Sequence, residues 1–230
     1  MSRSNTQMSR AARARVGLRG FSFVEILVVM GIIAVLVGLG LGAFKIVSQK
    51  APEVKTKALL QKVRASVDAW KGSYKATLPS DLQKLVLLGL PFKPGKPQPP
   101  NTTNAGIEAV VQCLYLPGTD QNPDLDGDLA NTDADNLDKA LSKTGLTALF
   151  EIVDAWGNPL VYFTDADYAK AEKDPPTYIC GEEAPNAGAA VNPKPWRNES
   201  GAFAQSGGYQ LYSMGPDGLP NTDDDIKAWH

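Results

Sequence analysis

The chain has 230 residues, a length that fits one globular domain together with a short anchor. The first 20 residues carry five arginines and no acid, so residues 21–230 have a formal net charge of −7, which argues against nucleic acid as a main partner. The single histidine is the last residue, His230, so His-based acid–base chemistry is not expected and we predict that the chain is not an enzyme.

The N-terminal region combines this basic leader with a long apolar run. The leader ends at Gly20, Phe21 opens the run, and the only charge near its start is Glu25; the 19 residues from 26 to 44 carry none. A helix of that length extends about 28 Å, close to the roughly 30 Å hydrocarbon core of a bilayer. The arginines predict that the leader stays in the cytoplasm and that the chain after Phe44 is exported. The segment FKIVSQKAPEVK offers no convincing signal-peptidase site, so we expect the span to be retained.

An amphipathic helix is predicted after the span. Pro52 is expected to kink this helix or to begin its outer half. Apolar residues recur at spacings of three and four, which places them on one face. They are Leu60, Val63, Val67, Trp70 and Tyr74.

The rest of the chain alternates short helical and extended patterns with turn-rich stretches. We expect a helix at 80–89, a Pro-rich loop at 90–100, a strand at 107–116, a helix at 137–152, a turn at 157–159 leading into a strand, an irregular stretch at 165–208, and a final strand that runs into an acidic loop. A long N-terminal helix packed on a small antiparallel sheet is an α+β arrangement. Cys113 and Cys180 lie in the exported part, where they could form one disulfide or remain as buried thiols.

The C-terminal segment gathers acids in a glycine-containing loop. The phrases YSMGPDG and TDDDI contain Asp217, Asp223, Asp224 and Asp225. Oxygen ligands of this kind suit Ca²⁺, which takes about 6–8 oxygens at roughly 2.3–2.6 Å. Without a cation the acids would repel one another in a closed loop. The alternative is a solvated acidic tail.

A second acidic loop lies upstream. Asn122, Asp124, Asp126, Gly127 and Asp133 match spaced positions of the calcium-loop template. An asparagine at the first position and an aspartate at the last both weaken the match, and the flanks do not resemble an EF-hand helix pair. The segment is either an isolated Ca²⁺ loop or a plain surface loop.

The residues GFSFVE at 20–25 and the uncharged run after them resemble the type IV prepilin signal. The resemblance implies that a membrane prepilin peptidase cuts between Gly20 and Phe21 and methylates the new amino terminus. Glu25 then becomes the fifth mature residue, and its carboxylate could pair with the Phe21 amine of a neighbouring subunit. The alternatives are an uncleaved signal anchor and a Glu25 that only reaches towards the lipid headgroups.

Two further phrases narrow the resemblance. DAWGNPLVY and the C-terminal acidic loop are similar to segments of the major pseudopilin of type II secretion. That resemblance implies Ca²⁺ bound by the side chains of Asp217, Asp224 and Asp225. The carbonyl oxygen of Met214 is the first candidate to complete the shell, with Ala228 as an alternative and Ser213 close by. Asp223 is a further candidate, because the register within three consecutive acids is open.

The resemblance also implies a division of the chain. Residues 1–20 would be a cleaved cytoplasmic leader, residues 21–44 a transmembrane and fibre-core helix, and residues 45–230 a periplasmic pilin-like domain. Segments near 91–150 and 165–207 are not covered by the resemblance and are read as insertions.

The function that follows is a structural one. The chain would be a pseudopilin that polymerises at the inner membrane into a periplasmic pseudopilus and helps to export folded proteins. Its partners would be the prepilin peptidase, other pseudopilins and copies of itself, an assembly platform with its ATPase, and the exported proteins. The alternatives are a type IV pilin or minor pilin for adhesion, DNA uptake or motility, and, more remotely, a membrane-anchored metal-dependent enzyme or binding module.

Overall fold

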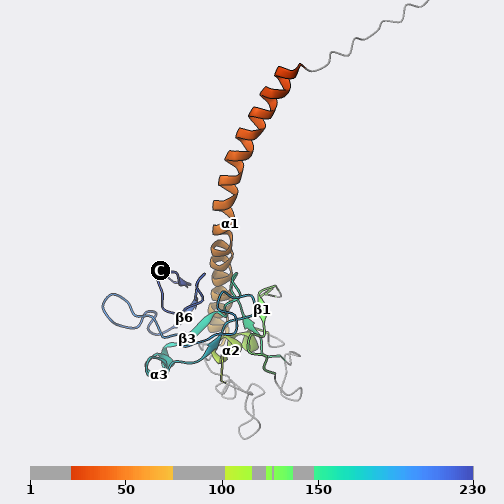
Figure 1. Cartoon of the computed structure of the whole chain (residues 1–230). Helices are drawn as coiled ribbons and strands as arrows, with labels where there is room; N and C mark the ends of the chain where they lie inside the picture. The colour runs from red at the N-terminus through yellow and green to blue at the C-terminus, as the bar shows by residue number, and fades with distance from the viewer. Residues whose placement is uncertain (1–21, 75–101, 116–122, 126, 137–147, 230) are drawn as a thin grey trace, which may run out of the picture. The chain divides into compact units, whose positions relative to one another are not determined.

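The computed structural model describes residues 22–74, 102–115, 123–125, 127–136 and 148–229, apart from the side chains of residues 39–49 and 74. The chain divides into two compact units, Met1–Val47 and Ser48–His230, and each is described by itself. Figure 1 labels the main elements along the chain. The predicted helix at 80–89 and the Pro-rich loop at 90–100 lie outside the described residues.

The first helix, α1, has the bounds Phe23–Tyr74. Its start is defined by Ser22, whose hydroxyl accepts a hydrogen bond from the Glu25 main-chain N–H at 3.2 Å. In return, the Glu25 carboxylate accepts a hydrogen bond from the Ser22 main-chain N–H at 2.8 Å. This reciprocal pair is a capping box, which satisfies two donors that the first turn of a helix would otherwise leave unpaired.

Among the described residues, none of the helices has a stretch both long and apolar enough for a membrane crossing. The span predicted at 26–44 continues into residues 39–49, whose side chains lie outside the described part, so the span stays a prediction.

The part of α1 that belongs to the second unit buries one face. The predicted apolar stripe is confirmed at four positions, each at most 3% exposed, which are Leu60, Val63, Val67 and Trp70. The side chain of Tyr74 lies outside the described residues. Pro52 lies inside α1, near Ser48 where the second unit begins, rather than at a helix start.

The strand predicted at 107–116 is wrong, because this segment forms helix α2 (Ala105–Leu114). Every residue from Gly106 to Leu114 is buried. A helix that is buried on all sides lacks a polar face, so its periodicity is hidden, and a short apolar run rich in β-branched residues imitates a strand. Asn104 precedes the helix with a left-handed φ of 54°.

The strands form small antiparallel sheets. The largest has β6 (Tyr209–Ser213) between β3 (Val161–Thr164) and β7 (Ile226–Lys227). Strand β3 and the C-terminal strand β6 confirm two predictions. The two remaining pairs are β1 (Leu129–Ala130) with β2 (Glu151–Ile152), and β4 (Tyr178–Ile179) with β5 (Ala190–Val191).

These elements confirm the α+β class. The helix predicted at 137–152 is not present in its described part, because Glu151–Ile152 forms β2 and pairs with β1. The pairing across the sheet, together with burial of both residues, outweighs the local helical pattern. Residues 137–147 lie outside the described residues.

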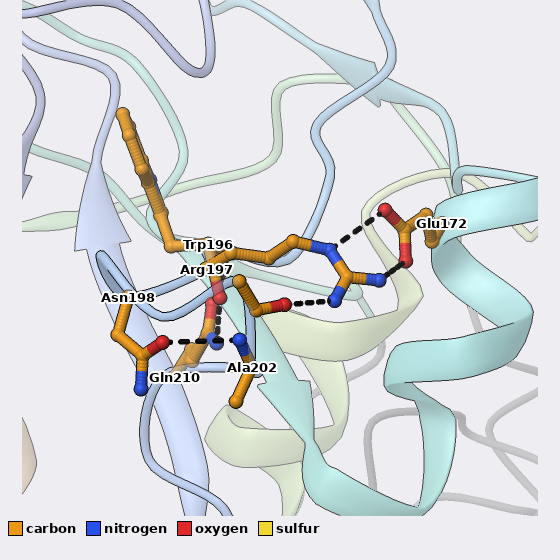
Figure 2. Close-up of polar contacts among 7 residues, drawn as sticks. Glu172, Trp196, Arg197, Asn198, Ala202 and Gln210 are labelled. Carbon is orange, nitrogen blue, oxygen red and sulfur yellow. Dashed lines mark hydrogen bonds and ion pairs between the residues drawn. The ribbon is translucent and has the colours of Figure 1, made fainter.

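The stretch at 165–208 was predicted to be irregular, and this prediction is wrong in part. It contains the short 3₁₀ helix η2 (Asp165–Asp167), helix α3 (Tyr168–Lys173) and the β4–β5 pair. Figure 2 shows how the segment after β5 is held: the guanidinium of Arg197 forms a two-pronged ion pair with Glu172 of α3. The Cζ atom of Arg197 also lies 4.1 Å from the centre of the Phe203 ring.

A buried amide fixes the same segment to the main sheet. The Gln210 side chain, fully buried in β6, accepts a hydrogen bond from the Trp196 main-chain N–H at 2.7 Å. Its Nε2 donates to the carbonyls of Trp196 at 2.9 Å and Ala204 at 2.8 Å (Figure 2 draws the Trp196 contacts). Hydrogen bonds between polar side chains and the main chain therefore fix this segment. Such bonds cannot be recognised in the hydropathy pattern of the sequence, which is why the segment was predicted to be irregular.

The core of the second unit contains both cysteines. Cys113 in α2 and Cys180 after β4 are buried free thiols rather than a disulfide. Burial raises the pKa of the Cys113 thiol to about 12, which keeps the thiol protonated and unreactive at neutral pH.

Candidate functional site

The predicted processing site, Gly20 and Phe21, lies outside the described residues. Glu25 is described: it lies in the first turn of α1, its side chain is exposed, and it forms the capping box with Ser22. A carboxylate at this end of a helix also interacts favourably with the positive end of the helix dipole.

Large apolar side chains surround this first part of α1. Twelve of them are between 47% and 75% exposed, in a stretch where every described side chain is exposed. They are Phe23, Val24, Ile26, Leu27, Val28, Val29, Met30, Ile32, Ile33, Val35, Leu36 and Val37. Full burial of such a side chain stabilises by about 1.5–3 kcal/mol, so water is an unfavourable environment for this segment.

The second unit contains a turn from Asp154 to Gly157, which overlaps the turn predicted at 157–159 only at Gly157, because Pro159 already forms an isolated bridge with Val153. Asp154 is only 4% exposed, and its carboxylate accepts four hydrogen bonds. The donors are the main-chain N–H groups of Trp156 (2.9 Å) and Asn158 (3.0 Å), the Asn158 amide (3.3 Å) and the Ser213 hydroxyl (2.5 Å). Burial raises the pKa of Asp154, and these hydrogen bonds act against that rise.

This turn holds the beginning of the C-terminal acidic loop. Asn158 Nδ2 donates to the Gly215 carbonyl at 2.9 Å, and the Gly215 N–H donates to the Ser213 hydroxyl at 3.0 Å. Gly215 has a φ of 66°, and a Cβ added there would lie 2.5 Å from the main-chain oxygen of Asp224. Glycine is therefore required where the two sides of the loop meet.

The predicted acids of the loop all belong to its internal hydrogen-bond network except Asp223, which is exposed. The Asp217 carboxylate accepts from the Leu219 N–H at 2.7 Å. Asp224 accepts from the Asp217 N–H at 3.2 Å and from the Thr222 hydroxyl at 2.6 Å. The turn and the network thus bring Asp217 and Asp224 to the same part of the loop.

Asp225 is the most perturbed acid of the loop. Its carboxylate accepts from the Asn221 N–H at 2.9 Å, and burial, followed by repulsion from Asp224, raises the pKa of Asp225 to about 7. The loop also borders a cavity of about 670 Å³, whose lining includes Lys57 and Gln61 of α1.

The predicted carbonyl ligands have different surroundings. Met214 is fully buried between β6 and the loop. The Ala228 carbonyl accepts a hydrogen bond from the Arg64 guanidinium of α1. A cation at this loop would therefore compete with Arg64 for that oxygen.

The second predicted metal loop is only partly described, because Asn122 and Asp126 lie outside the described residues. Asp124 is exposed, and its carbonyl accepts a hydrogen bond from Lys62 of α1. Asp133 lies elsewhere: its carboxylate is grouped with those of Glu108 and Glu151. Among the described residues this is the one group of three acids in which one carboxylate oxygen from each lies within 4.8 Å of the other two.

Glu108 and Glu151 were not anticipated by sequence reasoning. The available signal was that each is a single acid inside an apolar run, AGIEAVV and LFEIV. A lone acid in such a run is either solvent-facing or paired, and the sequence does not show which.

No model of a known protein family matches the chain, and no curated protein and no solved structure matches it either.

Proposed function

We propose that this chain is a pilin-like subunit, a pseudopilin of a type II secretion system, which polymerises into a periplasmic fibre that helps to export folded proteins. The observation that carries the proposal is the apolar surface of the first part of α1, from Phe23 to Val37. A helix that is apolar on every face needs an apolar environment. The bilayer would provide this environment before assembly, and the helices of neighbouring subunits would provide it afterwards.

The basic leader and Glu25 give that helix its direction and its register. Arginines in the leader favour a cytoplasmic N-terminus, and cleavage before Phe21 would place a new positive charge four residues ahead of Glu25. The capping box orients the Glu25 carboxylate towards the N-terminal end of α1. A carboxylate in this position can pair with the Phe21 amine of the next subunit, which compensates for a charge taken into an apolar fibre core.

In the second unit we propose that the C-terminal loop binds Ca²⁺ through Asp217, Asp224 and Asp225. Their carboxylate oxygens are the hard ligands that Ca²⁺ prefers. Burial, and after it repulsion from Asp224, raises the pKa of Asp225, and a bound cation would favour the ionised carboxylate against both effects. Asp154 and Asn158 would fix the loop against the main sheet, so that the bound ion stabilises the periplasmic domain in the form that assembles.

The proposed partners are the prepilin peptidase, copies of this chain and other pseudopilins, and an inner-membrane assembly platform with its ATPase. The deciding experiment is co-expression of the full chain with a prepilin peptidase, followed by mass spectrometry of the membrane-extracted protein. A mature chain that begins with N-methylated Phe21 is expected. A chain that keeps its leader, or that is cut beyond Phe44, would overturn the proposal.

A further inference from the structure

A group of buried acids lies in the second unit, away from the C-terminal loop. Glu108 comes from the first turn of α2, Glu151 from β2, and Asp133 from the segment after β1. One carboxylate oxygen of each lies within 4.8 Å of the other two. The β1–β2 pair explains the approach, because Ala130 is the direct partner of Glu151 and Asp133 follows three residues later.

Glu108 is the member that demands an explanation. Its side chain is fully buried, and within the described part of the chain neither of its carboxylate oxygens receives a hydrogen bond from a donor group. Asp135 adds a second buried acid of this kind: it is 5% exposed, and both of its carboxylate oxygens likewise find no partner among the described residues. Buried ionised groups are normally paired, because an uncompensated charge in a protein interior is strongly unfavourable.

The charges around Glu108 have one sign. Burial raises the pKa of Glu108, and the negative charges of Asp135, Glu151 and Asp133 raise it further. The Glu151 carboxylate is also within reach of a hydrogen bond from protonated Glu108, which raises the pKa as well, and no basic side chain acts against these effects. Burial also raises the pKa of Glu151, against hydrogen bonds from Thr132 and Asn104. The group must therefore either retain protons or hold a cation.

Glu151 is held as a preformed ligand. Its Oε1 accepts a hydrogen bond from the Asn104 amide at 3.0 Å, and its Oε2 accepts from the Thr132 N–H at 2.8 Å. The same Asn104 amide donates to the Thr132 hydroxyl at 2.8 Å, and its Oδ1 accepts from the Ile179 N–H at 3.0 Å. These bonds fix the carboxylate and leave lone pairs on both oxygens for a further partner.

We propose that Glu108, Asp133 and Glu151 bind a divalent cation, with Ca²⁺ preferred, at a structural site distinct from the C-terminal loop. Three oxygens no more than 4.8 Å apart leave room for one ion at the roughly 2.3–2.6 Å that Ca²⁺ takes to oxygen. An all-oxygen set disfavours Zn²⁺ and Cu²⁺, which prefer nitrogen and sulfur. Mg²⁺ keeps several waters, which two fully buried ligands do not favour.

The site would hold together three segments that are distant in sequence. The ion would connect α2, the segment that follows β1, and β2, and Asp133, the half-buried ligand, lies at its more exposed side. The site would therefore stabilise the β1–β2 pair, which has only two residues in each strand. A pair of such short strands contributes little stability by itself.

The test measures bound Ca²⁺ and thermal stability of the full chain in detergent. Wild type is compared with Glu108→Gln and Asp133→Asn, which remove charge with little change in shape. It is also compared with Asp224→Asn combined with Asp225→Asn in the C-terminal loop, and with Glu182→Gln at an exposed position as the matched control. Each protein is stripped with chelator, dialysed against CaCl₂ or MgCl₂, and analysed for bound metal and for its melting temperature.

We expect Glu108→Gln and Asp133→Asn each to bind one Ca²⁺ fewer per chain than wild type and to lose a Ca²⁺-dependent rise in melting temperature on the order of 5 °C. The C-terminal loop variant and Glu182→Gln should keep this site. In the presence of chelator, Glu108→Gln should melt at or above the wild-type temperature, which shows that the variant folds.

The proposal is overturned if both variants keep the wild-type stoichiometry and Ca²⁺ response, or if wild type binds no ion that these substitutions remove. Neither result depends on leader cleavage or fibre assembly.

Discussion

The Ser213 hydroxyl at the end of β6 donates a 2.5 Å hydrogen bond to the carboxylate of Asp154, which lies in the turn between β2 and β3. This contact joins two phrases that are 59 residues apart in the sequence. Both segments resemble parts of the major pseudopilin of type II secretion, but the resemblance alone does not show that the two segments are in contact. Asp154 therefore supports the acidic loop from outside it, without being a ligand candidate.

Asp154→Ala should be strongly destabilising. The change removes the acceptor of the buried Asn158 N–H, the partly buried Trp156 N–H and the buried Ser213 hydroxyl. It also removes one of the two acceptors of the Asn158 amide, which keeps its hydrogen bond to the Gly215 carbonyl. Each unsatisfied buried donor costs about 1–3 kcal/mol, so we expect the free energy of unfolding to fall by roughly 3 kcal/mol or more. Urea denaturation measures the loss. Asp223→Ala, at an exposed acid nearby, is the control and should change stability by less than about 0.5 kcal/mol.

Gly20→Val should block maturation. If the peptidase cuts after Gly20, a β-branched residue there crowds the bond to be cleaved, and the precursor should accumulate with its leader attached. Immunoblotting and intact-mass measurement distinguish the precursor from the mature form. Normal cleavage of this variant would argue against the proposed peptidase, whereas loss of cleavage with normal membrane insertion would support it.

Variants of Glu25 can separate its two roles. Glu25→Gln keeps an acceptor for the Ser22 N–H, so the capping box survives, but the negative charge is lost. If the carboxylate pairs with a neighbour's Phe21 amine, Glu25→Gln should be inserted and cleaved but should form few fibres in cells that lack a wild-type copy. Ser22→Ala removes half of the capping box and keeps the charge, so it should assemble well. Fibre yields that follow the cap rather than the charge would refute the pairing.

Several features were predictable from the sequence because they depend on local patterns. The buried stripe from Leu60 to Trp70 follows from helical periodicity. The sequence Gly-Asn-Pro indicates a turn, with Gly157 at a φ of 86°, although the turn itself runs from Asp154 to Gly157 and so begins three residues earlier than predicted. Strands β3 and β6 are short runs rich in aromatic and aliphatic residues beside clear turns. Such signals need no knowledge of distant contacts.

The features that escaped prediction depend on distant contacts. Helix α2 is enclosed by the rest of the second unit, so it has no polar face to reveal its period. Glu108 and Glu151 are separated by 43 positions in sequence, and only the fold brings their carboxylates together. The sequence placed Asp133 in a local calcium-loop template instead, because a template compares spacing along the chain and not proximity in space.

Calcium should stabilise the full chain through the C-terminal loop as well. Binding to the folded state alone adds RT ln(1 + [L]/Kd), about 2.7 kcal/mol at a concentration of 100 Kd. We therefore expect a higher melting temperature in millimolar Ca²⁺ than in chelator, with a smaller effect of Mg²⁺. Asp224→Ala combined with Asp225→Ala should remove the contribution of this loop, and a gain that persists should disappear when Glu108→Gln is added. Melting that is indifferent to Ca²⁺ in wild type would contradict both sites.

The acids near Glu108 predict a particular dependence on pH in the absence of divalent cations. Burial, followed by repulsion from Asp133, raises the pKa of Asp135 to about 7, well above the value of about 3.9 for an unfolded chain. Between these values the folded state binds more protons than the unfolded state, so the contribution of Asp135 to stability is present below about pH 4 and is lost as the pH rises towards 7.

Asp135→Asn should remove this decline. In the presence of chelator, the difference in unfolding free energy between variant and wild type should therefore grow in favour of the variant from pH 4 to pH 7. Urea denaturation at a series of pH values measures that difference, and Asp174→Asn, at an exposed acid, is the control that should leave the profile unchanged. A difference that stays constant with pH would mean that Asp135 is ionised in the folded protein at acid pH, and the repulsion inferred for this group would then be wrong.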